Sequence, residues 1–197
     1  VVIHSTTKYL NGHSDVVGGA VIAEERALHD ELAWWANCLG LTGAPFDSFL
    51  TLRGLRTLHA RLGLHEANAQ AVAESLRGHP AVRRVYWPGL ADHPGHALAR
   101  EQQRGFGAML SFEVANGEAG VRAFVEGLEY FSLAESLGGV ESLVAHPASM
   151  THAAMAPEAR ARAGISDSLL RLSIGIESAE DLVADLRAGL DRAAAVG

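Results

Sequence analysis

The chain has 197 residues, 48% of them hydrophobic and 20% charged, and its 16 basic and 23 acidic residues give a formal net charge of −7. These values are typical of a soluble globular protein with one ordinary domain, or one domain plus part of another. The sequence has no basic block, which argues against nucleic-acid binding, and no apolar run long enough to span a membrane. The single cysteine, Cys38, excludes an internal disulfide framework and fits a cytoplasmic protein.

Two short apolar runs open the chain. Residues 1–4 predict a buried parallel strand, and residues 15–23 (DVVGGAVIA) predict a second strand. The first run begins at Val1 without a methionine, as if the chain were cut inside a strand. We therefore expect an N-terminal half of the same protein to precede it.

Helical periodicity follows the second run. Residues 24–39 predict an amphipathic helix that ends at Gly40, and Gly43 and Pro45 predict a loop. From residue 47 to about residue 77 the leucines keep a helical period, which indicates one long helix linking two domains.

The remaining residues mix strands and helices irregularly. Strands are predicted within residues 79–90, 108–114, 130–134 and 169–175, and a short helix over residues 120–128. Ser178, followed three residues later by Asp181, predicts the start of a last helix. This order is typical of a small α+β unit.

Lys8 is the only lysine, whereas the other 15 basic residues are arginines. Arginine stays protonated, but a desolvated lysine amine loses its proton and condenses with an aldehyde. A lone lysine in this chain therefore indicates amine chemistry, with a chance surface lysine as the alternative.

Ser5 and Thr7 lie beside Lys8 at the end of the first predicted strand. In an extended segment residues two apart face one side, so both hydroxyls would point the same way. Two hydroxyls next to a lysine suit a phosphate held beside a Schiff base, as pyridoxal 5'-phosphate requires. Hydrogen bonding of these hydroxyls to the backbone is the alternative.

Several segments resemble one enzyme family along nearly the whole chain. The segments are HSTTKYLNGHSD (residues 4–15), LRGLRTL (52–58), GFGAMLSFE (105–113), AESLGGVESL (134–143), MTHAAMAPEARARAGIS (150–166) and LLRLSIGIE (169–177). They resemble the pyridoxal-phosphate enzymes of cysteine and methionine metabolism, and look closest to the bacterial cystathionine γ-synthases among them. The resemblance implies an α/β fold of the aspartate aminotransferase type (fold type I). Residues 1–46 would end the large cofactor domain, and residues 47–197 would form the linking helix and a small α+β domain.

The resemblance also implies roles for individual residues. Lys8 would bind the cofactor covalently and carry protons between substrate carbons, while Ser5 and Thr7 would hold the cofactor phosphate. Arg171, in LLRLSIG, would clamp the substrate α-carboxylate, because its planar fork matches a carboxylate. The alternative is a surface arginine on a strand, although an unpaired charge between apolar neighbours would be costly.

The segment ESLGG contributes the other substrate-binding candidates. The resemblance implies that Ser136 helps to position the lysine and the substrate, and that Glu135 receives the distal amino group of cysteine or cystathionine. A solvated loop glutamate is the alternative. Gly138 and Gly139 would allow a tight turn. Thr151 is a further candidate on the substrate side.

The implied reaction is γ-replacement, in which an O-acylhomoserine and cysteine give cystathionine in methionine biosynthesis. The alternative is a cystathionine γ-lyase, which eliminates at the γ carbon of cystathionine. The resemblance implies that an aromatic residue and an aspartate of the cofactor site precede Val1, and that the protein forms a homotetramer.

Rival motifs are weak. His93 and His96 form a close pair, but no cysteine or third histidine lies nearby, so no metal site is predicted. The Ser, His and Asp of GHSD lack the elbow pattern of hydrolase nucleophiles, and the glycines of GHSDVVGG do not form a dinucleotide-binding fingerprint.

Overall fold

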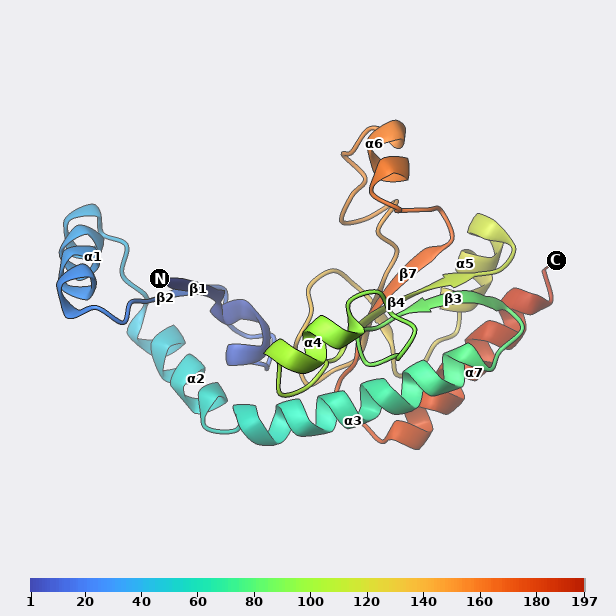
Figure 1. The fold of residues 1–197 in the computed structure, drawn as a ribbon, viewed down its shortest axis with the longest axis horizontal. Helices are drawn as coiled ribbons and strands as arrows, with labels where there is room; N and C mark the ends of the chain where they lie inside the picture. The colour runs from blue at the N-terminus through green and yellow to red at the C-terminus, as the bar shows by residue number, and fades with distance from the viewer. Residues whose placement is uncertain (197) are drawn as a thin grey trace. The chain divides into compact units, whose positions relative to one another are not determined.

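A computed structural model describes residues 1–196, which divide into two compact units (Figure 1). The first unit is Val1–Ala60 and the second begins at Arg61. Each unit is described by itself below. The domain boundary expected from the sequence between residues 46 and 47 stays a prediction.

The first unit holds two strands, a π-helical turn and two helices, followed by the start of a third helix. In chain order these are β1 (Val2–Ser5), η1 (Thr6–Leu10), β2 (Gly19–Ile22), α1 (Arg26–Leu39), α2 (Pro45–Leu55) and α3 (Leu58–Arg77).

The first strand differs from its prediction. β1 pairs with β2 in antiparallel register, with Val2 opposite Ile22, and not as a parallel strand. Gly12 and Ser14 both have positive φ, at 77° and 57°, and the chain reverses direction between the two strands. The strand is also exposed rather than buried, since Val2 and Ile3 keep 51% and 76% of their accessible surface.

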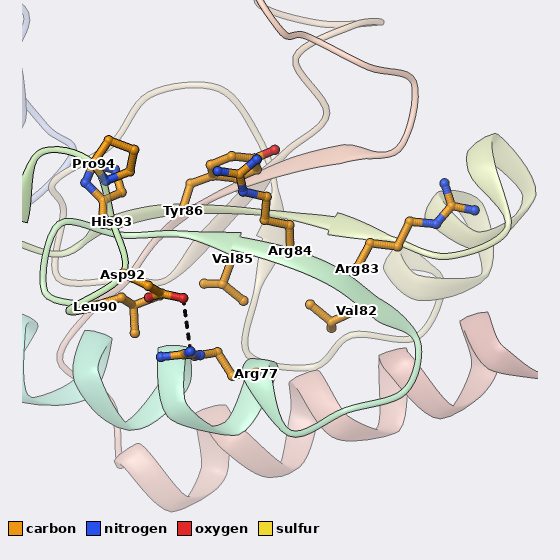
Figure 2. A pocket seen from close by; sticks show the side chains of 10 residues that line it. All are labelled: Arg77, Val82, Arg83, Arg84, Val85, Tyr86, Leu90, Asp92, His93 and Pro94. Atoms are coloured by element: carbon orange, nitrogen blue, oxygen red, sulfur yellow. Dashed lines mark hydrogen bonds and ion pairs between the residues drawn. The ribbon is translucent and has the colours of Figure 1, made fainter.

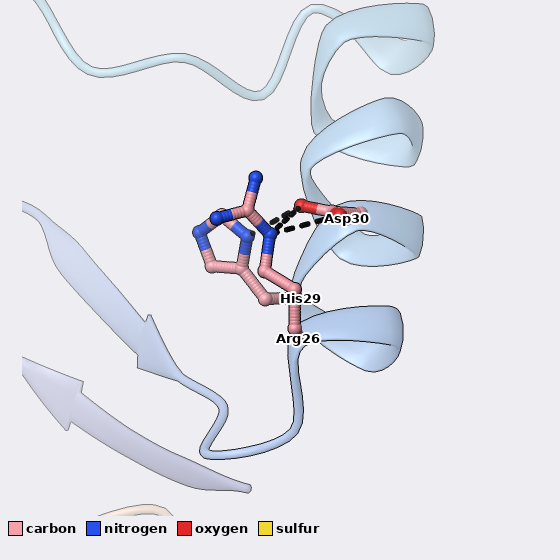
Figure 3. Close-up of polar contacts among 3 residues, drawn as sticks. All are labelled: Arg26, His29 and Asp30. Atoms are coloured by element: carbon pink, nitrogen blue, oxygen red, sulfur yellow. Dashed lines mark hydrogen bonds and ion pairs between the residues drawn. The ribbon is translucent and has the colours of Figure 1, made fainter.

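Helix α1 ends where the sequence predicts. Gly40 has φ 69°, the left-handed conformation that a glycine cap adopts without a side-chain penalty. Near the start of the helix Arg26 Nε donates to both carboxylate oxygens of Asp30 at 2.9 Å, and His29 Nδ1 lies 3.0 Å from Asp30 Oδ1 (Figure 3). Arg26 and then His29 lower the pKa of Asp30. The group is solvent-exposed, so it contributes little to stability.

The single long helix predicted over residues 47–77 is wrong, because α2 and α3 are separate helices. Thr57 ends α2 by donating both its backbone N–H and its hydroxyl to the carbonyl of Gly54, each at 3.1 Å. Threonine side chains compete with helical hydrogen bonds in this way. Leucine periodicity continues through the break, so it could not reveal it.

The second unit is built on a five-stranded sheet in the order β3-β4-β7-β6-β5. Figure 1 labels three of its neighbouring strands, β3, β4 and β7. All neighbours are antiparallel except β5 and β6. The strands are β3 (Val82–Tyr86), β4 (Met109–Val114), β5 (Ser132–Leu133), β6 (Leu143–Ala145) and β7 (Leu169–Ser173). The helices are the rest of α3 with α4 (His96–Gln102), α5 (Gly117–Val125), α6 (Pro157–Arg162) and α7 (Ala179–Ala194).

One face of this sheet forms the core. Along β4 every second residue is buried, as the alternation in the sequence predicts. Phe112 of β4 and Leu172 of β7 are fully buried in one cluster with side chains from α3, α5 and α7, such as Phe124 and Leu186. Arg171 lies on the opposite face, because its neighbours Leu170 and Leu172 point into the core.

The last helix begins as predicted, with the Ser178 hydroxyl accepting a hydrogen bond from the backbone N–H of Asp181 at 3.5 Å. Sequence periodicity missed α4, α6 and β6, which are at most seven residues long. Among the residues described, no helix is both long and apolar enough to cross a membrane.

Candidate functional site

The lysine segment lies in the first unit, where β1 ends and η1 begins. Lys8 is half-buried inside η1, and Ser5 is exposed at the last position of β1. Thr7 lies in η1 and not in the strand of Ser5, so the predicted extended segment, in which both hydroxyls would face one side, is wrong. Instead the Thr7 hydroxyl accepts from the N–H of Gly18 at 3.1 Å and lies 3.4 Å from its carbonyl oxygen.

Backbone hydrogen bonds hold this turn. The N–H of Thr6 donates to the Gly18 carbonyl at 2.9 Å, and the N–H of Gly12 donates to the Lys8 carbonyl at 2.8 Å. Asn11, 1% exposed, donates from Nδ2 to Asp15 at 2.6 Å. The backbone that carries Lys8 is therefore fixed on both sides of it.

Helix α2 packs against the same turn. A Cβ atom at Gly54 would collide with the backbone of Asn11, so only glycine allows this approach. The lysine segment therefore rests on the neighbouring helix as well as on its own hydrogen bonds.

The predicted carboxylate-binding arginine, Arg171, lies in the second unit. Arg171 Nη2 donates to the carbonyl oxygen of Ser136 at 2.7 Å. Its Nε is buried and has no hydrogen-bond partner among the described residues. A guanidinium oriented by a hydrogen bond at Nη2, with an Nε–H group still able to donate, is suited to bind a carboxylate.

The segment that carries Ser136 has an unusual backbone. Ser136 has φ 82°, a left-handed conformation that costs a non-glycine residue free energy. Gly138 has φ 80°, and its N–H donates to the buried hydroxyl of Ser173 at 2.9 Å. This segment therefore turns tightly at Gly138, as predicted, and is tied to the strand of Arg171.

The remaining candidates lie in the same unit. Glu135 is exposed and directly precedes Ser136. Thr151 lies in a segment of turns, exposed, with its hydroxyl 2.8 Å from Nδ1 of His152. The structure thus brings Arg171 and Ser136 into contact, and Glu135 adjoins them by sequence.

A surface pocket of about 230 Å³ along β3 holds several charged side chains (Figure 2). These groups already interact with one another, since Arg77 pairs with Asp92 at 3.1 Å and the Arg84 guanidinium lies 4.8 Å from the centre of the Tyr86 ring. The Tyr86 hydroxyl donates to Glu113 at 2.7 Å. Burial raises the pKa of Tyr86, and the hydrogen bond to the Glu113 carboxylate raises it further. We assign the pocket no ligand.

The histidine pair has structural contacts. His93 Nδ1 accepts from the N–H of Gly95 at 3.0 Å, and His96 stacks on Phe106 with centroids 5.1 Å apart. Within residues 1–196 no three histidine, cysteine or acidic side chains are grouped so that they could hold a metal ion.

Comparison with known proteins decides the family. Residues 1–191 match the family described as Cys/Met metabolism PLP-dependent enzyme. The chain belongs to this family. The family uses pyridoxal phosphate. Lys8, a half-buried residue on a turn held by backbone hydrogen bonds, supplies the kind of amine that this cofactor needs.

Individual relatives cover the chain almost completely. Cystathionine γ-synthase of Escherichia coli is 60% identical over 96% of the chain, and a cystathionine β-lyase of Lactococcus lactis is 50% identical over 98%. The crystal structure of a Xanthomonas oryzae cystathionine γ-synthase in complex with aminoacrylate and cysteine is 74% identical, covers 99% of the chain and has a TM-score of 0.95. Proteins named cystathionine γ-lyase match as well.

These relatives are longer than this chain. The chain covers 49% and 50% of the two curated relatives and 50% of the solved structure. The fold type expected from the sequence agrees with these structures, which belong to the cystathionine synthase and lyase group.

Sequence reasoning missed Ser142 and Glu177, which contact each other next to the segment that holds Arg171. Ser142 and Glu177 lie 35 positions apart and share two hydrogen bonds. A glutamate closing the strand segment LLRLSIGIE was the only local signal.

Proposed function

We propose that the protein catalyses γ-replacement, in which an O-acylhomoserine reacts with cysteine to give cystathionine. The observation that carries this proposal is Glu135 directly preceding Ser136, whose carbonyl oxygen holds the guanidinium of Arg171. A carboxylate beside a carboxylate-binding arginine suits substrates with a second, distal amino group. The similarity to two cystathionine γ-synthases supports the same reaction.

In this proposal each side chain has a distinct part. Arg171 binds the α-carboxylate through two parallel N–H groups and orients the substrate. Lys8 holds the cofactor through Nζ, takes the proton from the substrate α carbon and later returns protons to the carbon chain. Ser5 and Thr7 hold the cofactor phosphate, with the Thr7 hydroxyl already placed by Gly18. Glu135 receives the amino group of the incoming cysteine.

The cofactor, when bound, supplies a ring that withdraws electrons from the α carbon of the substrate. The γ carbon loses its acyloxy group and gains the sulfur of cysteine, so one carbon–oxygen bond is exchanged for one carbon–sulfur bond. Ser136 and Thr151 border the substrate in this arrangement. We also propose that a further segment of similar length completes the site, that the assembled protein is a homotetramer, and that it acts in the cytoplasm.

Cystathionine γ-elimination is the second candidate. A cystathionine γ-lyase of Dictyostelium discoideum is 48% identical over 98% of the chain, which supports the same residues serving that reaction.

Two assays of the full-length, cofactor-loaded protein separate the candidates. One supplies O-succinylhomoserine or O-acetylhomoserine with cysteine, and the other supplies cystathionine alone. We expect cystathionine formation in the first and little 2-oxobutyrate in the second. Fast 2-oxobutyrate formation in the second assay, with no cystathionine formed in the first, would identify a lyase and reject the synthase.

A variant of Glu135 tests the specificity residue. Glu135→Gln is expected to raise KM for cysteine about tenfold and to leave KM for the acyl ester nearly unchanged, because only cysteine would contact this carboxylate. Equal changes for both substrates would reject the role.

A further inference from the structure

A buried polar network lies behind the segment that carries Ser136. The carboxylate of Glu177 accepts two hydrogen bonds from Ser142, from its N–H at 2.6 Å and from its hydroxyl at 2.9 Å. Ser142 is fully buried. The same hydroxyl accepts from the N–H of Gly175 at 2.8 Å, so its donor and acceptor capacity are both used.

Helix α3 adds a third component. Asn68, 3% exposed, donates from Nδ2 to the carbonyl oxygens of Gly175 and Glu177 at 3.1 and 2.8 Å. The N–H of Ile176 donates to the Val140 carbonyl at 2.9 Å. Residues 140–142 and 174–177 are therefore joined by side chains as well as by backbone.

The backbone packs closely against this network at Gly175. A Cβ atom at Gly175 would collide with the Glu177 carboxylate and the Val140 carbonyl. A Cβ atom at Gly139 would collide with the carboxylate of Glu141. The backbone contact requires glycine at position 175, whereas at position 139 the Glu141 side chain could shift to make room.

The network is continuous with the segment that contacts Arg171. Residues 136–142 form one segment, with Ser136 at one end bonded to Arg171, Gly138 bonded to Ser173, and Ser142 at the other end bonded to Glu177. Arg171 and Ser173 face the same side of β7, because they are two residues apart on a strand. The position of the Ser136 carbonyl is thus set by contacts at both ends of the segment.

We propose that Glu177 is a positioning residue for recognition of the substrate α-carboxylate. By fixing Ser142 and the segment up to Ser136, Glu177 keeps the Arg171 guanidinium turned so that its unsatisfied nitrogen faces the substrate. Glu177 itself does not touch the substrate. This inference rests on the proposed function only in assigning the α-carboxylate to Arg171.

The test uses Glu177→Gln in the full-length, cofactor-loaded protein, with Glu180→Gln on the exposed first turn of α7 as the matched control. Gln has the same size, but its amide nitrogen cannot accept from the Ser142 hydroxyl. We expect KM for the amino-acid substrate to rise about tenfold with kcat changed by less than about twofold, since a lost charge-assisted hydrogen bond acts on binding. The control should match the unaltered protein.

Equilibrium binding of two simple probes gives a second readout that does not require turnover. Titration by saturation-transfer NMR compares butanoate, which has the carboxylate but no amine, with butylamine, which has the amine but no carboxylate. We expect Kd for butanoate to rise by about the same factor as KM, and Kd for butylamine to stay constant. Equal weakening of both probes would show a general structural role and overturn the proposal.

Two further variants keep the proposal falsifiable. Ser142→Ala removes the same hydroxyl contact and should reproduce the loss of butanoate affinity if Glu177→Gln fails to fold. In an Arg171→Lys background Glu177→Gln should cause no additional loss, because it acts through Arg171; a full additional loss would overturn the proposal. If the unaltered protein forms no cystathionine but the butanoate result holds, only the proposed function is rejected.

Discussion

Arg171 and Ser136 are joined by a hydrogen bond of 2.7 Å from the guanidinium to a backbone carbonyl, although they are 35 residues apart in the chain. The bond occupies one Nη2–H and leaves the buried Nε without a hydrogen-bond partner in the described part of the chain. This pairing orients the planar fork of the arginine.

Replacing this arginine by lysine should impair carboxylate binding while the charge is kept. We expect Arg171→Lys to raise KM for the amino-acid substrate by about 100-fold, because an ammonium cannot hold both the Ser136 carbonyl and a bidentate carboxylate. Steady-state kinetics measures the change. Arg83→Lys on the exposed surface of β3 is the control and should leave KM unaltered. An Arg171→Lys variant with normal KM would exclude a carboxylate contact at this position.

Lys8 should be the attachment point of the cofactor. Reduction of the loaded protein with borohydride, followed by digestion and mass spectrometry, is expected to find the pyridoxyl group on the peptide that contains Lys8, the only lysine of these 197 residues. Lys8→Arg should remove the label and lower kcat by about 1,000-fold or more, because a guanidinium does not form the bond. A label that persists in Lys8→Arg would place the attachment elsewhere.

The buried side chain of His65 should make the stability of the protein depend on pH. The side chain is fully buried, and Nδ1 lies 2.6 Å from the Ile174 carbonyl, so Nδ1 carries the proton and donates. Burial lowers its pKa below the ordinary value of 6.5, against the smaller opposing effect of this hydrogen bond. Below pH 6.5 the unfolded chain therefore binds a proton that the folded chain does not, and the free energy of unfolding falls as the pH falls.

Denaturant unfolding at a series of pH values checks this prediction. The stability of the unaltered protein should decrease as the pH falls below 6.5, and His65→Gln should show a shallower decrease. His59→Gln, which alters an exposed histidine, should keep the original slope. Identical slopes in all three proteins would rule out His65 as the source.

Asp185 of α7 should be important for stability. Its carboxylate is 8% exposed and accepts from the N–H groups of Glu129, Tyr130 and Phe131 at 2.9, 2.9 and 3.2 Å. Asp185→Asn puts an amide nitrogen against these donors, so we expect a loss of about 2–3 kcal/mol in the free energy of unfolding. Asp181→Asn, on the exposed first turn of the same helix, should cost less than about 1 kcal/mol. Chemical denaturation measures both, and equal costs would contradict this account.

Local patterns predicted strands β4 and β7 of the second unit well. Alternation identified β4, and the apolar run of LLRLSIG identified β7. An arginine between buried leucines requires a partner, but Ser136 supplies it through a contact that no local pattern specifies.

Predictions failed where pairing partners decide the outcome. The run at Val2 and Ile3 has the composition of a buried parallel strand. The chain reverses direction after η1, near Gly12, so this strand pairs with β2 in antiparallel register, and both side chains are exposed. The requirement for glycine at position 54 of α2 comes from the close approach of the Asn11 backbone, which belongs to another segment. Such contacts arise from tertiary structure and leave little trace in periodicity.

The two edges of the five-stranded sheet are both poor templates for another strand. β5 has only two residues, and β3 carries a register shift between Val82 and Arg84 with exposed arginines on it. Short edges, irregular register and charge each discourage edge-to-edge pairing between molecules. The sheet can therefore stay open at both sides without nucleating aggregation.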